Sequence, residues 1–122
     1  ESGRAAAITL LEQAGPEPLT CILCFNDRMA IGAMQELQAR GLRVPEDISL
    51  AGFDDIPLVQ TLHPALTTVR QPADLLGIRS AEVMLEWLKP GLDRRKTALP
   101  ALDPIVIPSR LVVRESLKPI NR

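Results

Sequence analysis

This chain has few aromatic side chains, no excess of basic residues and no long apolar run. Its 122 residues include one Trp, two Phe and no Tyr, so Phe53 offers only a weak stacking platform for a ligand. The net charge of −1 gives no electrostatic footprint for nucleic acid or for an anionic membrane. No apolar run approaches the ~20 residues that a membrane-spanning helix needs. We therefore expect this chain to contact neither DNA nor a membrane directly.

Catalytic signatures are missing as well. His63 is the only histidine, and it stands before a proline in an apolar run, so no Ser-His-Asp set is present. The doublet Asp54-Asp55 has the chemistry to hold Mg²⁺ or to accept a phosphoryl group, but no glycine-rich phosphate loop follows any predicted strand. We expect no enzymatic activity, no cofactor and no metal.

The two cysteines, Cys21 and Cys24, have the spacing of a redox or zinc motif. On a strand, three residues of about 3.3 Å each separate their Cα atoms by about 10 Å and turn the side chains to opposite faces. A disulfide rarely tolerates more than about 7 Å, and a zinc site would need two further ligands. We interpret both as small buried hydrophobes. Free thiols and the absence of a signal peptide ahead of the first predicted helix are typical of a cytoplasmic protein.

The middle of the chain predicts a strand, a helix and a second strand. Residues 19–25 (LTCILCF) and 48–53 (ISLAGF) have the composition of fully buried strands. An amphipathic helix capped by Asp27 separates them, with a core face of Ala30, Ala33, Met34 and Leu37. This order implies two parallel strands joined by a right-handed crossover. The fold class is therefore α/β with a parallel sheet.

Further elements flank this unit on both sides. We expect helices at about residues 3–14 and 74–89, and strands at 66–70 and 105–114. The third helix should face inward through Ile78, Ala81, Leu85 and Leu88, and Phe25 and Trp87 should belong to the core. The first helix has no strand before it, and parallel sheets need both faces covered. We therefore expect the sheet to be incomplete in this chain and to belong to a larger binding protein.

Polar side chains follow both central strands where each strand ends. Asn26 follows the first strand, and Asp54 follows the second. In open parallel sheets the ligand crevice lies beyond the carboxyl ends of the strands. A carboxylate accepts hydrogen bonds from two vicinal hydroxyls, and a carboxamide both donates and accepts, so the pair suits a sugar or another polyol. The alternative is that both residues merely cap the segments that follow them.

An apolar run comes directly after the double aspartate. It contains Ile56, Leu58, Val59 and Leu62, and Met29 and Ile31 on the preceding helix should lie close by. An exposed apolar patch beside a site is typical of a protein interface, which favours self-association here. The alternative is an excursion of this segment into the core.

These motifs together resemble a known family. Residues 25–72 (FNDRMAIGAMQELQARGLRVPEDISLAGFDDIPLVQTLHPALTTVRQP) are similar to the effector-binding domain of LacI/GalR-type transcription regulators, and residues 109–116 (SRLVVRES) resemble its last strand. The resemblance implies a periplasmic-binding-protein-like (type I) fold of two three-layer α/β lobes with the ligand between them. By this resemblance, about 1–65 and 104–116 form one lobe, and about 66–92 cross into the other.

The resemblance also implies roles for individual residues. Asn26 and Asp54 match family positions that hydrogen-bond effector hydroxyls, and Gln71 lies in the region between the lobes. The start of the second helix and the loop after the double aspartate match the family's dimer contacts, which would include Met29, Ile31, Ile56, Leu58, Val59 and Leu62.

The implied function is effector sensing within a homodimeric, cytoplasmic transcription regulator. A sugar or sugar-like metabolite would shift the dimer geometry and thereby the affinity for operator DNA. DNA would be contacted only through a helix-turn-helix headpiece, which this chain lacks. The alternative is the sugar-binding protein of an ABC transporter, which shares the fold. An upstream headpiece would support the regulator, and an upstream secretory leader would support the transporter.

Overall fold

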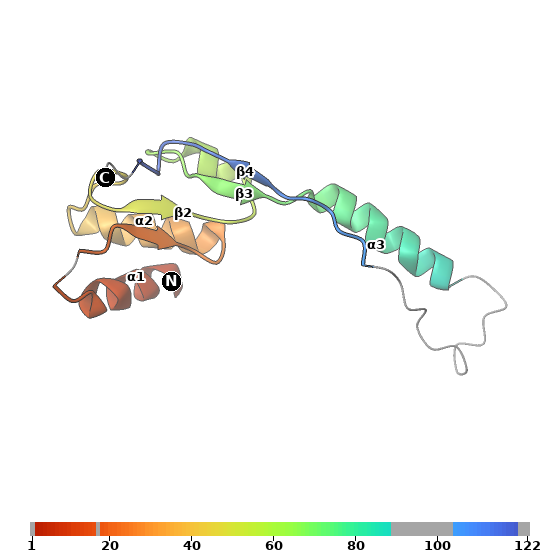
Figure 1. The fold of residues 1–122 in the computed structure, drawn as a ribbon, viewed down its shortest axis with the longest axis horizontal. Helices are drawn as coiled ribbons and strands as arrows, with labels where there is room; N and C mark the ends of the chain where they lie inside the picture. The colour runs from red at the N-terminus through yellow and green to blue at the C-terminus, as the bar shows by residue number, and fades with distance from the viewer. Residues whose placement is uncertain (1, 17, 89–103, 120–122) are drawn as a thin grey trace. The chain divides into compact units, whose positions relative to one another are not determined.

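The computed structural model describes residues 2–16, 18–88 and 104–119. Figure 1 shows the order of the elements along the chain: α1 (Ser2–Gln13), β1 (Cys21–Leu23), α2 (Asp27–Ala39), β2 (Ser49–Ala51), the 3₁₀ helix η1 (Pro57–Thr61), β3 (Thr68–Arg70), α3 (Ala73–Trp87) and β4 (Arg110–Val112). The chain forms two compact units. The first comprises Glu1–Gln71 and Arg110–Arg122, and the second comprises Pro72–Ser109. The predicted lobe boundaries stay a prediction.

The predicted strand-helix-strand unit is confirmed. β1 runs parallel to β2, with Ile22 opposite Leu50, and α2 connects the two strands. Isolated parallel bridges at Ala51–Thr67 and Asp54–Arg70 join β2 to β3. β3 in turn pairs antiparallel with β4. The first unit thus carries a mixed row of strands in the order β1, β2, β3, β4.

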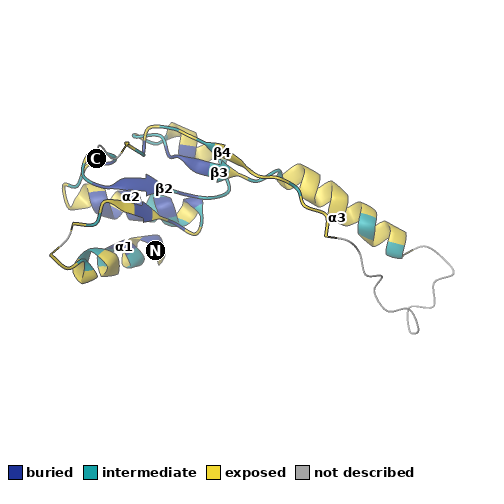
Figure 2. Ribbon diagram, viewed as in Figure 1, coloured by how far each residue is buried: buried dark blue, intermediate teal, exposed yellow. Residues whose placement is uncertain are grey.

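The core of the first unit lies between α2, β2 and the segment that leads into β3. Figure 2 shows the buried residues of these elements in dark blue. The fully buried hydrophobic side chains include Leu37 on α2, Leu50 on β2, Val59 in η1 and Leu66 before β3. Burying one such side chain stabilises the fold by about 1.5–3 kcal/mol, so these residues hold the sheet and η1 together.

Helices α1 and α2 pack closely at Gly3. A Cβ atom at this position would lie 2.1 Å from the backbone oxygen of Met29, so no other residue fits without a backbone shift. The contact is reinforced by Glu36, whose carboxylate accepts hydrogen bonds from Arg4 at 2.6 Å and from Arg40 at 2.7 Å. α1 begins at Ser2, one residue before the predicted start.

β1 departs from the prediction of a fully buried strand. It spans only three residues, and Ile22 is buried while Cys21 and Leu23 are exposed. Phe25, predicted to belong to the core, is 84% exposed. The period-2 geometry of a strand turns alternate side chains to opposite faces, and no described element covers the second face of β1. Both cysteines are free, and Cys24 is buried as predicted, whereas Cys21 is exposed. Burial raises the pKa of the Cys24 thiol to about 11.

α3 forms as a helix without a buried face. The predicted inward residues Ile78, Leu85 and Leu88 are 56%, 67% and 40% exposed, and none of the described residues of α3 is buried. Pro104, Ile105 and Ile107 lie beside this helix, but they leave its apolar side chains largely exposed. The end predicted at residue 89 lies outside the described residues. Within the described residues, no helix is long and apolar enough to cross a membrane.

Candidate functional site

The carboxyl ends of β1 and β2 meet at one edge of the sheet. The backbone N–H of Asp27 donates to the carbonyl oxygen of Phe53 at 2.8 Å, which joins the segment after β1 to the segment after β2. Asn26 and Asp54 each lie one residue from this hydrogen bond. The two predicted ligand residues are therefore carried on directly connected segments, which we call the rim (residues 26–27 and 52–56).

Asn26 is the N-cap of α2. Its backbone is extended (φ −152°), and its Oδ1 accepts a hydrogen bond from the backbone N–H of Met29 at 2.9 Å. The prediction that Asp27 caps this helix is wrong, because Asp27 is the first helical residue and turns its side chain inward. The Asn26 side chain is half-buried, and among the described residues its Nδ2 has no hydrogen-bond partner. Nδ2 of Asn26 can therefore donate to a ligand while Oδ1 caps the helix.

Asp54 is held in an unusual backbone conformation. Its φ of 113° and the φ of 58° at Asp55 both lie in the left-handed region, which costs a non-glycine residue about 1–3 kcal/mol. The N–H of Asp54 donates to the carbonyl oxygen of Val69 on β3 at 2.9 Å. Its Oδ1 accepts a hydrogen bond from Nε2 of Gln71 at 2.7 Å. The structure therefore brings together two of the three predicted ligand residues.

Asp55 forms an ionic cluster that the sequence analysis did not identify. Its side chain is 2% exposed, and its two oxygens accept hydrogen bonds from Arg70 at 2.5 Å and from Arg114 at 2.6 Å. Burial alone raises the pKa of the Asp55 carboxyl, but the hydrogen bonds from Arg114 and Arg70 outweigh it and hold this pKa below its ordinary value. The cluster ties the rim to β3 and to the segment after β4. Arg114 is 59 residues away, so no local pattern indicates the pair.

The inward orientation of the Asp27 side chain is a second feature that the sequence does not indicate. This aspartate is fully buried, and its carboxylate accepts hydrogen bonds from Oγ1 of Thr68 at 2.6 Å and from the N–H of Ile56 at 2.9 Å. Gly52 packs against it, because a Cβ at that position would lie 2.3 Å from Oδ1 of Asp27. An aspartate at a helix start is typical of a cap, so the sequence offered no signal for this inward orientation.

The residues predicted for an interface divide into two groups. Met29, Ile31, Ile56 and Leu62 are partly buried against the core, and Leu58 is 54% exposed. Four of these five, all except Leu62, line a broad surface hollow that also reaches Asn26. Val59 is fully buried in the core, so it presents no surface to a partner. We call the remaining five residues the apolar surface.

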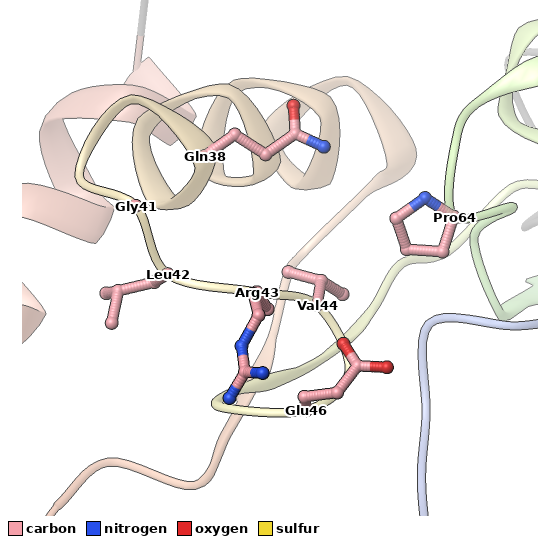
Figure 3. Close-up of a pocket in the computed structure, with 7 residues that line it drawn as sticks. All are labelled: Gln38, Gly41, Leu42, Arg43, Val44, Glu46 and Pro64. Atoms are coloured by element: carbon pink, nitrogen blue, oxygen red, sulfur yellow. The ribbon is translucent and has the colours of Figure 1, made fainter.

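A second hollow lies at the opposite end of α2. Figure 3 shows its lining: Gln38, Gly41, Leu42, Arg43, Val44, Glu46 and Pro64. It contains none of the predicted site residues, because the carboxyl end of α2 is far along the helix from Asn26. Among the described residues no group of three histidine, cysteine or acidic side chains is arranged to hold a metal ion. The rim, which presents the Asn26 amide and the Asp54 carboxylate beside Gln71, is the better candidate for ligand binding.

Comparison with known proteins identifies the family of this chain. Residues 1–117 match the model of the periplasmic binding protein-like domain. The chain is 40% identical over 102 residues to the HTH-type transcriptional repressor PurR of Vibrio vulnificus, an alignment that covers 84% of this chain and 28% of that protein.

Two solved structures show the same fold. The transcriptional regulator CelR in complex with cellobiose has a TM-score of 0.79 and 33% identity over 94% of this chain and 32% of its own. The Lac repressor dimer bound to operator and the anti-inducer ONPF has a TM-score of 0.77 and 31% identity over 95% of this chain and 37% of its own. The chain thus spans about a third of the length of these relatives. It belongs to the periplasmic binding protein-like domain family, in the form found in regulators of the LacI/GalR type.

Proposed function

We propose that this chain is the effector-binding part of a DNA-binding transcription regulator, and that its rim binds a hydroxyl-rich small molecule such as a sugar. The observation that carries the proposal is the contact between Gln71 and Asp54 on a rim segment that is hydrogen-bonded to the segment of Asn26. Asp54 and Gln71 are in direct contact, and Asn26 is carried on the neighbouring segment.

The chemistry of these groups fits hydroxyls. The carboxylate of Asp54 has two oxygens, of which Gln71 occupies one, so the other accepts from a ligand hydroxyl. Nδ2 of Asn26 donates to a hydroxyl or ring oxygen, and the Gln71 carbonyl accepts. A charged acceptor contributes about 1.5–3 kcal/mol per hydrogen bond, so Asp54 would supply the largest polar share of the affinity.

The relatives support a role in gene regulation. PurR is a transcriptional repressor, CelR is described with cellobiose, and the Lac repressor is described as a dimer on its operator. By analogy, the full-length protein would be a cytoplasmic homodimer that binds operator DNA through a separate segment. Effector binding between the lobes would change the dimer geometry and the spacing of the DNA-binding segments.

The apolar surface is the proposed dimer contact. Met29, Ile31, Ile56, Leu58 and Leu62 come from two elements of the first unit that both border the rim. Exposed apolar patches of this kind are typical of protein interfaces. A contact so close to the ligand residues would let ligand binding alter the association of two copies.

The experiment measures sugar affinity in the full-length protein by titration calorimetry, with cellobiose and D-ribose as probes. Asp54→Asn should weaken binding of the sugar that the wild-type protein binds by at least tenfold. Asp47→Asn is the matched control, since Asp47 lies beyond the opposite end of α2 and should leave the affinity unchanged. Equal affinities for the wild-type protein and Asp54→Asn would refute the site.

The sugar-binding protein of an ABC transporter remains the second candidate, because it shares the fold and the sugar chemistry of the rim. Selection of a DNA sequence by the full-length protein from a random pool would support the regulator. Failure to retain any DNA in the same selection would favour the transporter protein.

A further inference from the structure

The buried carboxylate of Asp27 has no part in the proposed ligand contacts, yet it touches every segment that carries them. We infer that Asp27 is a positioning residue that sets the shape of the rim and couples it to the apolar surface at Ile56. This inference rests on the proposed function, because it assigns the support of that same site.

Asp27 forms hydrogen bonds on both sides of the left-handed pair Asp54-Asp55. Its backbone N–H donates to the carbonyl oxygen of Phe53, directly before the pair, at 2.8 Å. Its Oδ2 accepts a hydrogen bond from the N–H of Ile56, directly after the pair, at 2.9 Å. Two consecutive left-handed residues persist only where the surroundings fix both ends. Asp27 contacts both ends, so it constrains the backbone that carries the Asp54 carboxylate, while Gln71 orients the carboxylate itself.

The other carboxylate oxygen of Asp27 reaches β3. It accepts a hydrogen bond from Oγ1 of Thr68 at 2.6 Å. The carbonyl oxygen of the neighbouring Val69 accepts a hydrogen bond from the N–H of Asp54. Gln71, three residues after Thr68, completes the contact to Asp54. The Asp27 side chain therefore anchors the strand that presents Gln71 as well as the segment that presents Asp54.

The Asp27 side chain has no space to move independently of residues 52–56. Gly52 lies so close that a methyl group there would meet Oδ1 of Asp27 at 2.3 Å, and both residues are buried. When a ligand draws Asp54 or Gln71 toward itself, the displacement passes through the Asp27 hydrogen bonds to Ile56. Ile56 belongs to the apolar surface, so ligand binding and self-association share one support.

The test perturbs the hydrogen bond between Asp27 and Thr68 while keeping its surroundings filled. In the full-length protein, Thr68→Val deletes the hydroxyl donor and keeps the branched shape, and Thr68→Ser keeps the hydroxyl as the conservative rescue. Asp27→Asn keeps the size of the side chain and changes the bond to Thr68. Thr9→Val is the matched control, because its hydroxyl donates to the carbonyl oxygen of Ala5 within α1.

Three measurements separate positioning from a general loss of stability. Amide hydrogen exchange is followed at Ile56 and, for comparison, in α1. The dimer dissociation constant is measured by sedimentation equilibrium, and the affinities for cellobiose and D-ribose by calorimetry. Thr68→Val and Asp27→Asn should speed exchange at Ile56 at least tenfold without changing α1, and should weaken dimerisation and sugar binding at least fivefold. Thr68→Ser and Thr9→Val should stay within twofold of the wild type.

Exchange that rises equally in α1 and at Ile56, or an unchanged dimer constant in Thr68→Val, would overturn the inference. If the wild-type protein binds neither probe, the proposed sugar effector fails by itself. The exchange and dimer measurements then still decide the role of Asp27. If Asp27→Asn does not fold, the contrast between Thr68→Val and Thr68→Ser decides it.

Discussion

Gln71 donates a hydrogen bond from Nε2 to Oδ1 of Asp54 at 2.7 Å, across 17 residues of sequence. Asp54 follows β2, and Gln71 follows β3, so this contact ties the ends of two neighbouring strands together. Gln71 is also the last residue of the first compact unit before α3 begins. The Gln71 amide therefore orients the Asp54 carboxylate, and Gln71 is the residue at which the chain leaves the first unit.

The first prediction concerns this amide. Gln71→Ala should weaken sugar binding about tenfold, because Asp54 loses the hydrogen bond that orients it. Gln71→Glu should weaken binding further, since two carboxylates would then face each other within hydrogen-bonding distance. Calorimetric titration of the full-length protein with the sugar that it binds gives both values. An affinity of Gln71→Glu equal to that of the wild type would contradict the assignment.

The second prediction concerns Gly52. Gly52→Ala should lower the free energy of unfolding by about 1–3 kcal/mol, because the new methyl group meets Asp27, whose carboxylate is held by two hydrogen bonds. Gly77→Ala is the control, since nothing lies within 4 Å of that position and alanine favours a helix. Urea unfolding measures both variants. A Gly52→Ala protein as stable as the wild type would show that Asp27 moves freely.

The third prediction is a pH dependence. The pKa of Asp55 in the folded protein lies below its ordinary value, so its ion pairs with Arg114 and Arg70 stabilise the fold above the unfolded-state pKa of about 3.9. This contribution is lost as the pH falls through the folded-state pKa. Asp55→Asn should therefore lower stability by about 2–3 kcal/mol at pH 7 and much less at acidic pH.

Urea unfolding of the wild type and of Asp55→Asn between pH 7 and pH 3 measures this difference. Arg79→Gln serves as the control, because its exposed pair with Glu82 on α3 contributes little to stability. A stability difference between the wild type and Asp55→Asn that stays constant down to pH 3 would contradict the role given to the cluster.

The fourth prediction concerns the apolar surface. Leu58→Glu places a charge at an exposed position of η1 and should raise the dimer dissociation constant at least tenfold, while the free energy of unfolding of the monomer changes by about 0.5 kcal/mol or less. Leu10→Glu on α1, similarly exposed and outside this surface, should leave association unchanged. Sedimentation equilibrium of the full-length protein decides the matter. Equal effects of the two substitutions would place the interface elsewhere.

The sequence by itself predicted the order of the α-helices and strands, the parallel pairing of the two central strands, the start of α2 within one residue and the family, but not the 3₁₀ helix η1. These features depend on local periodicity and on short runs of residues, which a single chain displays directly. The positions of Asn26 and Asp54 after neighbouring strands follow from the same local logic, because parallel strands end at a common edge.

Only the tertiary structure decided which polar side chain does what at that edge. Asn26 caps the helix and Asp27 turns inward, although either residue type serves as a cap, because buried partners for a carboxylate come from Ile56 and Thr68 far along the chain. Asp55 likewise depends on Arg114. The exposure of Phe25 and α3 has the same physical reason: a pattern shows that a face is apolar, but burial is decided by what packs against it.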